Sequence, residues 1–140
     1  MTELSLNVSR TIDATPEALF NAWLNPKMVA RFMAPGPDMT VPHVANDPVV
    51  GGRFDIIMKA GDQELPHAGT YKEIDPHSRL VFTWESPMSI DGSTVTLTFK
   101  SVNGGTEVNL HHVKFQNEEM RGNHEGGWIA ILGKLETAVT

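Results

Sequence analysis

Apolar and polar residues alternate through much of the stretch from residue 54 to residue 110, and this pattern constrains the fold most strongly. Period-two alternation is typical of strands that bury one face. The clearest run covers residues 94–100, where Val95, Leu97 and Phe99 share one face. Turn signals separate the runs, among them Asp91-Gly92 and Asn103-Gly104-Gly105. Because short turns join neighbouring antiparallel strands, the pattern predicts an antiparallel meander.

The segment before the meander predicts a strand followed by two short helices. Leu4, Leu6 and Val8 alternate with polar residues, which indicates a half-buried strand. Thr15-Pro16-Glu17 is a typical helix start, because threonine can cap a helix and proline suits its first turn. Asn25-Pro26 then interrupts the apolar stripe and starts a second short helix. A further strand is expected near residues 39–44, which gives about six or seven strands in all.

The end of the chain predicts a helix that packs on the sheet. Its apolar residues recur at spacings of three and four and so share one face: Trp128, Ile131, Leu132, Leu135, Ala138 and Val139. Three glycines in or next to this stretch each weaken helix propensity by roughly 1 kcal/mol relative to alanine. Packing must therefore hold this helix, and the sheet is the large apolar partner. His124 and Glu125 are expected to precede it.

Composition restricts the class of protein. The chain has 140 residues, which suits a single domain over 1–140. A net charge of −6 argues against partners such as nucleic acid or an anionic membrane surface. No apolar run approaches the ~20 residues that a membrane-spanning helix needs. The N-terminus lacks the features of a secretory signal, so a cytoplasmic location is expected. With no cysteine, disulfides and thiol chemistry are excluded.

Several segments resemble one known family. They are the helical segment 14–23 with Asn25-Pro26, the strand start Gly51-Gly52-Arg53-Phe54, the central hairpin 69–76 with 79–84, and the end segments 94–99, 105–108 and 124–128. In these segments the chain resembles the bacterial proteins similar to the C-terminal domain of the activator of the heat-shock-protein-90 ATPase. These proteins belong with the START-like, polyketide-cyclase and birch-pollen-allergen superfamily.

The resemblance implies an α+β helix-grip fold with a cavity. In this fold a curved antiparallel sheet wraps around the long C-terminal helix. A strongly curved sheet does not close fully on one helix, and we expect a pocket of about 300–1,000 Å³. Alternation of the strands and the helical stripe predict the residues that meet there, as ligand-binding candidates: Phe54, Ile56, Met58, His67, Tyr71, Phe82, Trp84, Leu97, Phe99, His112, Trp128 and Leu132.

Polar residues on the inner face are the informative members of this set, because buried polar groups require partners. The register of the last strand points His112 inward and His111 outward. His67 shares a face with Tyr71. Either histidine can orient a ligand or act as an acid or base near neutral pH, or it can serve structure alone through backbone hydrogen bonds.

No metal site or cofactor is expected. His111 and His112 are adjacent on a strand, so they point to opposite faces and cannot chelate together. Asp55 and Glu85 are predicted to point outward, away from a carboxylate pair with Glu73. The chain shows no order of serine, histidine and aspartate typical of a hydrolase, and no phosphate-binding loop.

Three functions stay open at this point. The leading hypothesis is a protein that binds a small, mostly hydrophobic or aromatic molecule in the cavity. The second is a cofactor-free enzyme, such as a cyclase, dehydratase or hydrolase, that uses His67, His112 and Tyr71. The third, implied by the family resemblance, is a module that modulates a chaperone ATPase. Catalytic residues are not identified, and the oligomeric state, a homodimer included, is left undecided.

Overall fold

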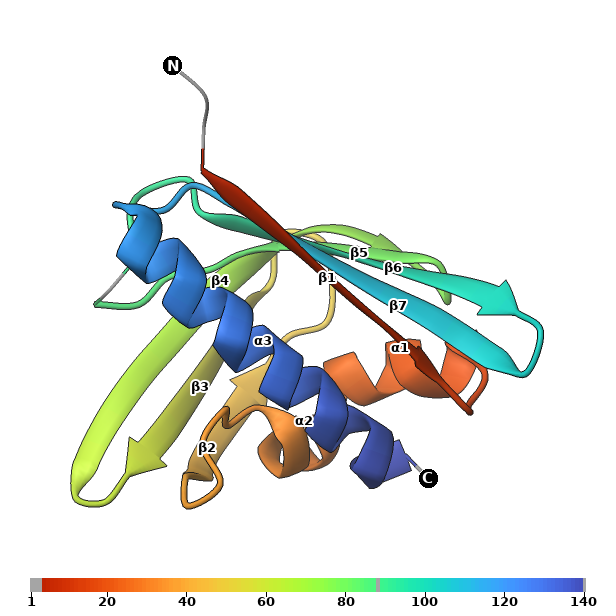
Figure 1. The fold of residues 1–140 in the computed structure, drawn as a ribbon, viewed down its shortest axis with the longest axis horizontal. Helices are drawn as coiled ribbons and strands as arrows, with labels where there is room; N and C mark the ends of the chain where they lie inside the picture. Colours follow the sequence, from red (N-terminus) through yellow and green to blue (C-terminus); the bar gives the residue numbers. More distant parts are fainter. Residues whose placement is uncertain (1–3, 88, 140) are drawn as a thin grey trace.

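The computed structural model describes residues 4–87 and 89–139. Within these residues the chain forms seven strands and three helices: β1 (Ser5–Ile12), α1 (Pro16–Leu24), α2 (Pro26–Phe32), β2 (Thr40–Asn46), β3 (Arg53–Ala60), β4 (Gln63–Asp75), β5 (Arg79–Thr83), β6 (Thr94–Val102), β7 (Gly105–Val113) and α3 (Glu118–Val139). The strands form one antiparallel sheet in the order β1-β7-β6-β5-β4-β3-β2 (Figure 1). The predicted α+β helix-grip fold is confirmed, and none of the described helices is long and apolar enough to cross a membrane.

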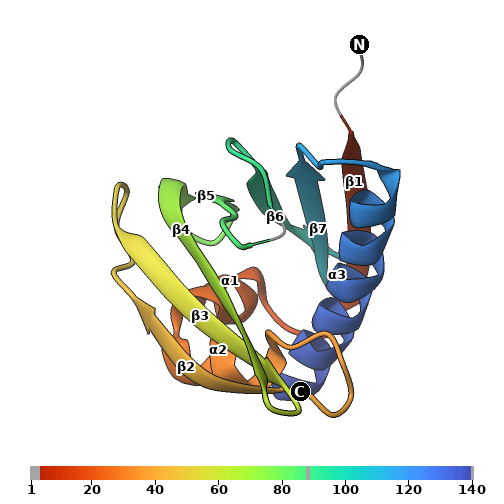
Figure 2. The ribbon, with the colours of Figure 1, turned by 90° about the vertical axis from the view of Figure 1, so that its left-hand side faces the viewer.

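Strand β4 joins two halves of the sheet that lie at an angle to each other. Its first part pairs with β3, from Gln63 to Thr70, and its last part pairs with β5, from Tyr71 to Asp75. The register shifts between Tyr71 and Glu73. Figure 2 shows the β2–β3–β4 half turned away from the half that contains β6, β7 and β1, with α3 along the opposite side. The turned half therefore forms a wall that faces α3.

Gly69 occupies the bend of β4. A methyl group at this position would overlap the carbonyl oxygen of Thr83, and it would lie 2.5 Å from ring atoms of Phe54. The neighbouring amide of Thr70 bonds to the Thr83 hydroxyl at 2.8 Å. Glycine is needed here because the two backbones and an aromatic ring meet without room for a side chain.

The two short helices begin at the predicted residues. The Thr15 hydroxyl accepts the amide of Ala18 at 3.1 Å, and the Asn25 side chain accepts the amide of Lys27 at 2.9 Å. Each cap is followed by a proline at the first helical position. Helix α2 contacts both β2 and α3, so it closes one end of the space between the sheet and α3.

Helix α3 begins ten residues before the apolar stripe that predicted it. The Asn117 side chain accepts the amide of Met120 at 2.9 Å and caps the helix. Arg121 then bridges Glu118 and Glu125 along one face. The expectation that His124 and Glu125 precede the helix is wrong, because they lie inside it. The extra turns are polar and rich in glycine, so hydrophobic periodicity does not mark them.

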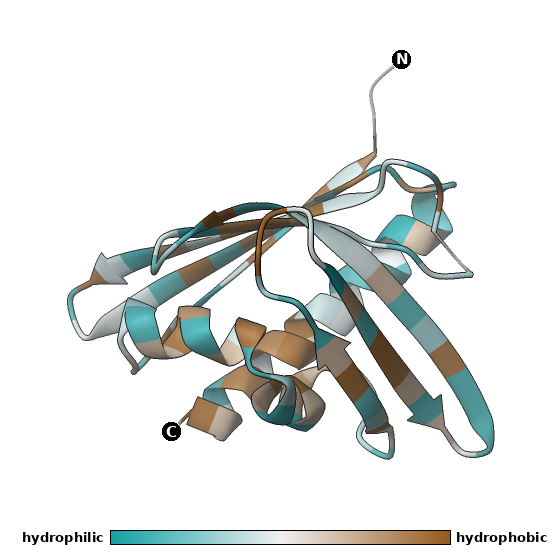
Figure 3. Cartoon of the chain, turned by 180° about the vertical axis from the view of Figure 1, so that it is seen from behind, coloured by the Kyte–Doolittle hydropathy of each residue, from teal (hydrophilic) through white to brown (hydrophobic). Residues whose placement is uncertain are grey.

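The apolar face of the sheet meets α3, α1 and α2 in one core. Figure 3 shows apolar and polar segments alternating along the strands, as the sequence predicts. From α3, the core receives Trp128, Ile131, Leu132 and Leu135, all at most 3% exposed. From the sheet it receives the inward residues of β3, β5, β6 and β7.

A buried chain of hydrogen bonds fixes α3 to the sheet. The Trp128 indole donates to Nδ1 of His112 at 3.0 Å, and Nε2 of His112 lies 2.7 Å from the Ser93 hydroxyl. Because an indole can only donate, Nδ1 is the acceptor and Nε2 carries the proton that goes to Ser93. All three residues are at most 2% exposed. Both ring nitrogens of His112 are thus occupied, and Trp128 is held in one orientation.

The Gly69→Ala variant tests the bend of β4. We expect it to lower the free energy of unfolding by about 2 kcal/mol or more, because the methyl group must displace backbone. Urea unfolding followed by circular dichroism measures the change. Gly133→Ala in α3 is the matched control, since its methyl group meets no atom within 4 Å and should stabilise by roughly 1 kcal/mol. A Gly69→Ala variant as stable as wild type would contradict this account.

Stability should fall between pH 7.5 and pH 5.5. Burial lowers the pKa of His112 to about 3 and the pKa of His67 to about 4, whereas unfolded histidine titrates near 6.5. Acid therefore protonates the unfolded chain first, so the stabilisation is complete above about pH 6.5 and is lost toward the two folded pKa values.

Urea unfolding at the two pH values should show a loss on the order of 1 kcal/mol for each of these histidines. His112→Gln should be less stable at pH 7.5 and should lose about half of the pH dependence. The exposed His43 provides the control, and His43→Gln should keep the wild-type profile. Parallel profiles for wild type and His112→Gln would refute the assignment.

Candidate ligand-binding pocket

The larger of two neighbouring apolar pockets lies between α3 and the β3–β4 hairpin. Its volume is about 160 Å³. Its walls come from the segment after α2, from β3 and β4, from Trp84 and from the first half of α3: Pro35, Met39, Met58, Leu65, His67, Trp84, Asn123, His124, Gly127, Trp128 and Ile131. The pocket is smaller than the 300–1,000 Å³ expected, because α2 and the segment after it fill part of the space beside α3.

Lys134 fixes the segment after α2 in place. Its ammonium group donates to the carbonyl oxygens of Ala34 and Gly36 at 2.5 and 2.7 Å. These carbonyls flank Pro35, which lines the pocket, and Met39, which also lines it, follows Pro35 by four residues. A cation that satisfies two loop carbonyls holds the loop against the helix from which it extends.

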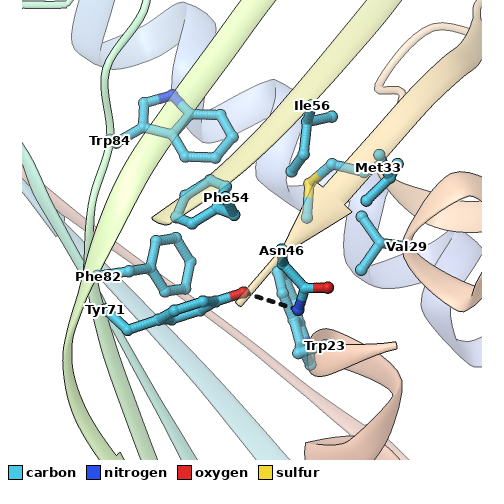
Figure 4. Close-up of a pocket in the computed structure, with 10 residues that line it drawn as sticks. Trp23, Val29, Met33, Asn46, Phe54, Ile56, Tyr71, Phe82 and Trp84 are labelled. Carbon is cyan, nitrogen blue, oxygen red and sulfur yellow. Dashed lines mark hydrogen bonds between the residues drawn. The ribbon is translucent and has the colours of Figure 1, made fainter. Parts of the chain in front are cut away.

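The smaller pocket lies between α1, α2 and strands β2 to β5, and its volume of about 20 Å³ has room for a single water molecule. Figure 4 shows Phe54, Phe82 and Trp84 along one side of it, with Val29 and Met33 opposite. Its polar end is a hydrogen bond of 3.1 Å from the Asn46 amide to the Tyr71 hydroxyl (Figure 4). Burial raises the pKa of Tyr71, so its hydroxyl is protonated at neutral pH.

Trp84 forms part of both pockets and lies between them. It follows directly after β5, where the chain pairs once more with β4 through the bridge between Ala68 and Glu85. Its ring lies 4.9 Å from that of Trp128 and 5.0 Å from that of His67. The indole nitrogens of Trp84 and Trp23 are buried and have no hydrogen-bond partner in the described part of the chain. A buried donor without a partner costs about 1–3 kcal/mol, so each of these donors favours an acceptor brought by a bound molecule.

Two histidines contact the larger pocket. His67, 7% exposed, extends from β4, and Nδ1 of its ring lies 3.0 Å from the Leu65 carbonyl oxygen. His124 lies in α3, and Nδ1 of its ring lies 2.8 Å from the Met120 carbonyl oxygen. Since a carbonyl oxygen only accepts, both Nδ1 atoms carry the proton when the rings are neutral. Each ring then has Nε2 as its acceptor.

The structure divides the predicted set of residues into three groups. The smaller pocket is lined by Phe54, Ile56, Tyr71, Phe82 and Trp84. The larger pocket is lined by Met58, His67, Trp84 and Trp128. The remaining predicted residues are buried in the core and line neither of these two pockets: Leu97, Phe99, His112 and Leu132.

The polar candidates of the enzyme hypothesis do not meet in one pocket. His112 points inward as predicted, but Trp128 and Ser93 occupy both of its nitrogens. Tyr71 lines the smaller pocket, whereas His67 lines the larger one. Of these three residues, His67 is the one that keeps a nitrogen acceptor available to a ligand.

The carboxylates considered in the sequence lie on the outside of the sheet. Glu85 forms a bidentate ion pair with Arg53, in which both N–O distances are 3.0 Å. This pairing lowers the pKa of the Glu85 carboxyl group. Glu73 lies 3.1 Å from Arg79. These carboxylates therefore pair with arginines and not with each other.

Sequence reasoning missed the pocket residues that come from irregular or polar segments. Pro35 lies between elements, where no periodicity assigns a direction to a side chain, and Met39, expected at the start of a strand, precedes β2 by one residue. His124 and Gly127 lie in the polar turns of α3 that the apolar stripe does not mark. The sequence signal that indicates the true start of α3 is Asn117, because asparagine favours the position before a helix.

Comparisons with known proteins agree with this architecture. A crystal structure of a protein from Chromobacterium violaceum is 22% identical, covers 96% of each chain and has a TM-score of 0.85. CalU16 from Micromonospora echinospora is 21% identical, covers 99% of this chain and 77% of its own, and has a TM-score of 0.75. At these identities the likeness concerns the fold. A comparison with curated proteins gives no match.

A solution structure of an AHSA1-like protein from Aeromonas hydrophila is 28% identical, with 97% of this chain and 92% of that chain covered and a TM-score of 0.84. The family model described as activator of Hsp90 ATPase homolog 1-like protein matches residues 13–140. That match spans both short helices, six of the seven described strands and α3. The chain therefore belongs to the family of proteins like activator of Hsp90 ATPase homolog 1.

Proposed function

We propose that this protein binds a small, mostly hydrophobic or aromatic molecule in the larger pocket between α3 and the β3–β4 hairpin. The observation that carries this proposal is the chemistry of the pocket wall. Methionine, leucine, isoleucine and tryptophan side chains make up most of it, together with a few polar groups. Apolar concave surfaces with a small number of polar groups are typical of sites for small molecules.

The volume limits the size of the molecule. An apolar cavity of about 150 Å³ accepts benzene, and this pocket has about 160 Å³. A single aromatic ring with one or two small substituents fits this space. The indole rings of Trp84 and Trp128, which both line the pocket with their centroids 4.9 Å apart, favour an aromatic guest over a branched aliphatic one.

A substitution at Gly127 can fill the pocket without changing any other residue that lines it. This residue lies in α3 at the pocket, and a methyl group on it would lie 3.5 Å from Pro35. A leucine at this position would extend farther into the same space. Gly126, the preceding residue, is exposed, and a methyl group on it meets no atom within 4 Å.

Wild type should bind p-xylene saturably, and Gly127→Leu should lose this binding at least tenfold because its side chain occupies the pocket. Gly126→Leu should bind like wild type, since both leucines raise helix propensity equally. Titration followed by ¹H–¹⁵N NMR measures the affinity, with the Trp128 indole and the Gly127 amide as reporters in wild type.

Two results would count against the proposal. One is the absence of saturable binding of p-xylene, naphthalene and 4-methylphenol up to their solubility limits. The other is equal binding by Gly127→Leu and Gly126→Leu, which would place the ligand elsewhere. Modulation of a chaperone ATPase remains a prediction from the family resemblance alone.

A further inference from the structure

We infer that the ligand is a neutral aromatic molecule of about one ring that carries a hydroxyl group, and that this hydroxyl donates to Nε2 of His67. The inference rests on the proposed function, and it adds the polar group that the pocket selects. It follows from the tautomer of His67, from the charge of the pocket wall and from the space around the ring.

His67 lines the pocket and keeps one ring nitrogen as an acceptor. Its Nδ1 proton goes to the Leu65 carbonyl at 3.0 Å, which leaves a lone pair on Nε2. Burial lowers the pKa of the ring to about 4, so at neutral pH the ring stays uncharged and this lone pair stays available. No described residue donates a hydrogen bond to it. A ligand that enters the pocket therefore meets an acceptor and gains by bringing a donor.

The pocket does not favour a charged ligand. Among the described residues that line it, none is aspartate, glutamate, lysine or arginine. A carboxylate would lose its hydration without gaining a cation, and it would bring no hydrogen for His67. An ammonium group would likewise find no carboxylate. Desolvation without a partner of opposite charge is costly, so the pocket selects a neutral molecule.

A hydroxyl group fits the number of polar partners better than other neutral donors. A primary amide brings two N–H groups and a carbonyl oxygen, so besides His67 it requires His124 as a second acceptor and a donor such as the indole N–H of Trp84. A hydroxyl brings a single hydrogen, which His67 can accept. The second acceptor at the pocket, Nε2 of the partly buried His124, lies on the α3 side and provides for a further hydroxyl.

The ring of the ligand has aromatic neighbours next to that acceptor. The ring centroids of His67 and Trp84 lie 5.0 Å apart, and Trp128 lies 4.9 Å beyond Trp84. A phenol whose oxygen reaches Nε2 of His67 thus has its ring alongside an indole. This arrangement satisfies the donor and buries the apolar ring in the same 160 Å³.

The test compares 4-methylphenol with p-xylene, which has a methyl group in place of the hydroxyl and nearly the same shape. Isothermal titration gives the ratio of their affinities for wild type and for His67→Leu. We expect this ratio to fall about tenfold in His67→Leu, mainly through weaker 4-methylphenol binding. His67→Gln keeps an acceptor oxygen and should retain most of the preference. His43→Leu, on the exposed face of β2, should leave the ratio unchanged.

The outcomes separate this inference from the proposed function. An unchanged ratio in a folded His67→Leu variant would overturn the inference, while saturable binding of both molecules would leave the proposed function standing. If neither molecule binds wild type, both the inference and the proposed function are refuted. A direct readout in wild type covers the case of a variant that does not fold. The ¹⁵N resonance of Nε2 in His67 should move upfield with 4-methylphenol and not with p-xylene, and equal behaviour with both would refute the inference.

Discussion

The close approach of three groups at Gly69 is the constraint on which the rest of the structure depends. The carbonyl of Thr83, the ring of Phe54 and the backbone of β4 meet there without space for a side chain. This contact lets one strand pair with β3 at its start and with β5 at its end. Without the bend, the β2–β3–β4 half would continue the plane of the other strands, and α3 would have no wall opposite it. The pocket exists because the sheet turns at this residue.

Rigid attachments surround the pocket and leave a few polar atoms without partners. The chain from Ser93 through His112 to Trp128 fixes the back of the pocket, and Lys134 fixes the loop at its front. In contrast to these bonded groups, Nε2 of His67 and the buried indole N–H of Trp84 have no hydrogen-bond partner among the described residues. A ligand in the cavity can provide the hydrogen-bond partners that the protein itself does not supply to such groups. Both ring nitrogens of His112 are bonded, so the described histidines of this pocket that keep a ring nitrogen for a ligand are His67 and His124.

Local patterns in the sequence predicted the strands and short helices well. The residues that line the pocket depend on contacts between segments far apart in the sequence, which local patterns do not show. Alternation in residues 94–100 and the caps Thr15 and Asn25 are local signals, so strands and short helices could be read directly. The inward direction of His67 and His112 followed from strand register. The pairing of His112 with Trp128 could not be read, because it joins residues from a strand and a helix whose relative position depends on the whole core. The pocket volume was overestimated for the same reason, since α2 and its following loop have no period that shows how far they fill the space.

The pairing of β1 with β7 has a consequence for how this chain is made. Ser5 pairs with Val113, so the first strand leaves the ribosome long before its partner has been synthesised. Throughout that interval β1 exposes both of its edges, and the hairpins from β3 to β6 can form ahead of it. Strands β2 to β7 lie side by side in the order of their synthesis, so the sheet can be completed from its β2 edge, and the earliest strand is the last to find its partner. Such a high sequence separation of contacts is characteristic of domains that fold slowly and close cooperatively.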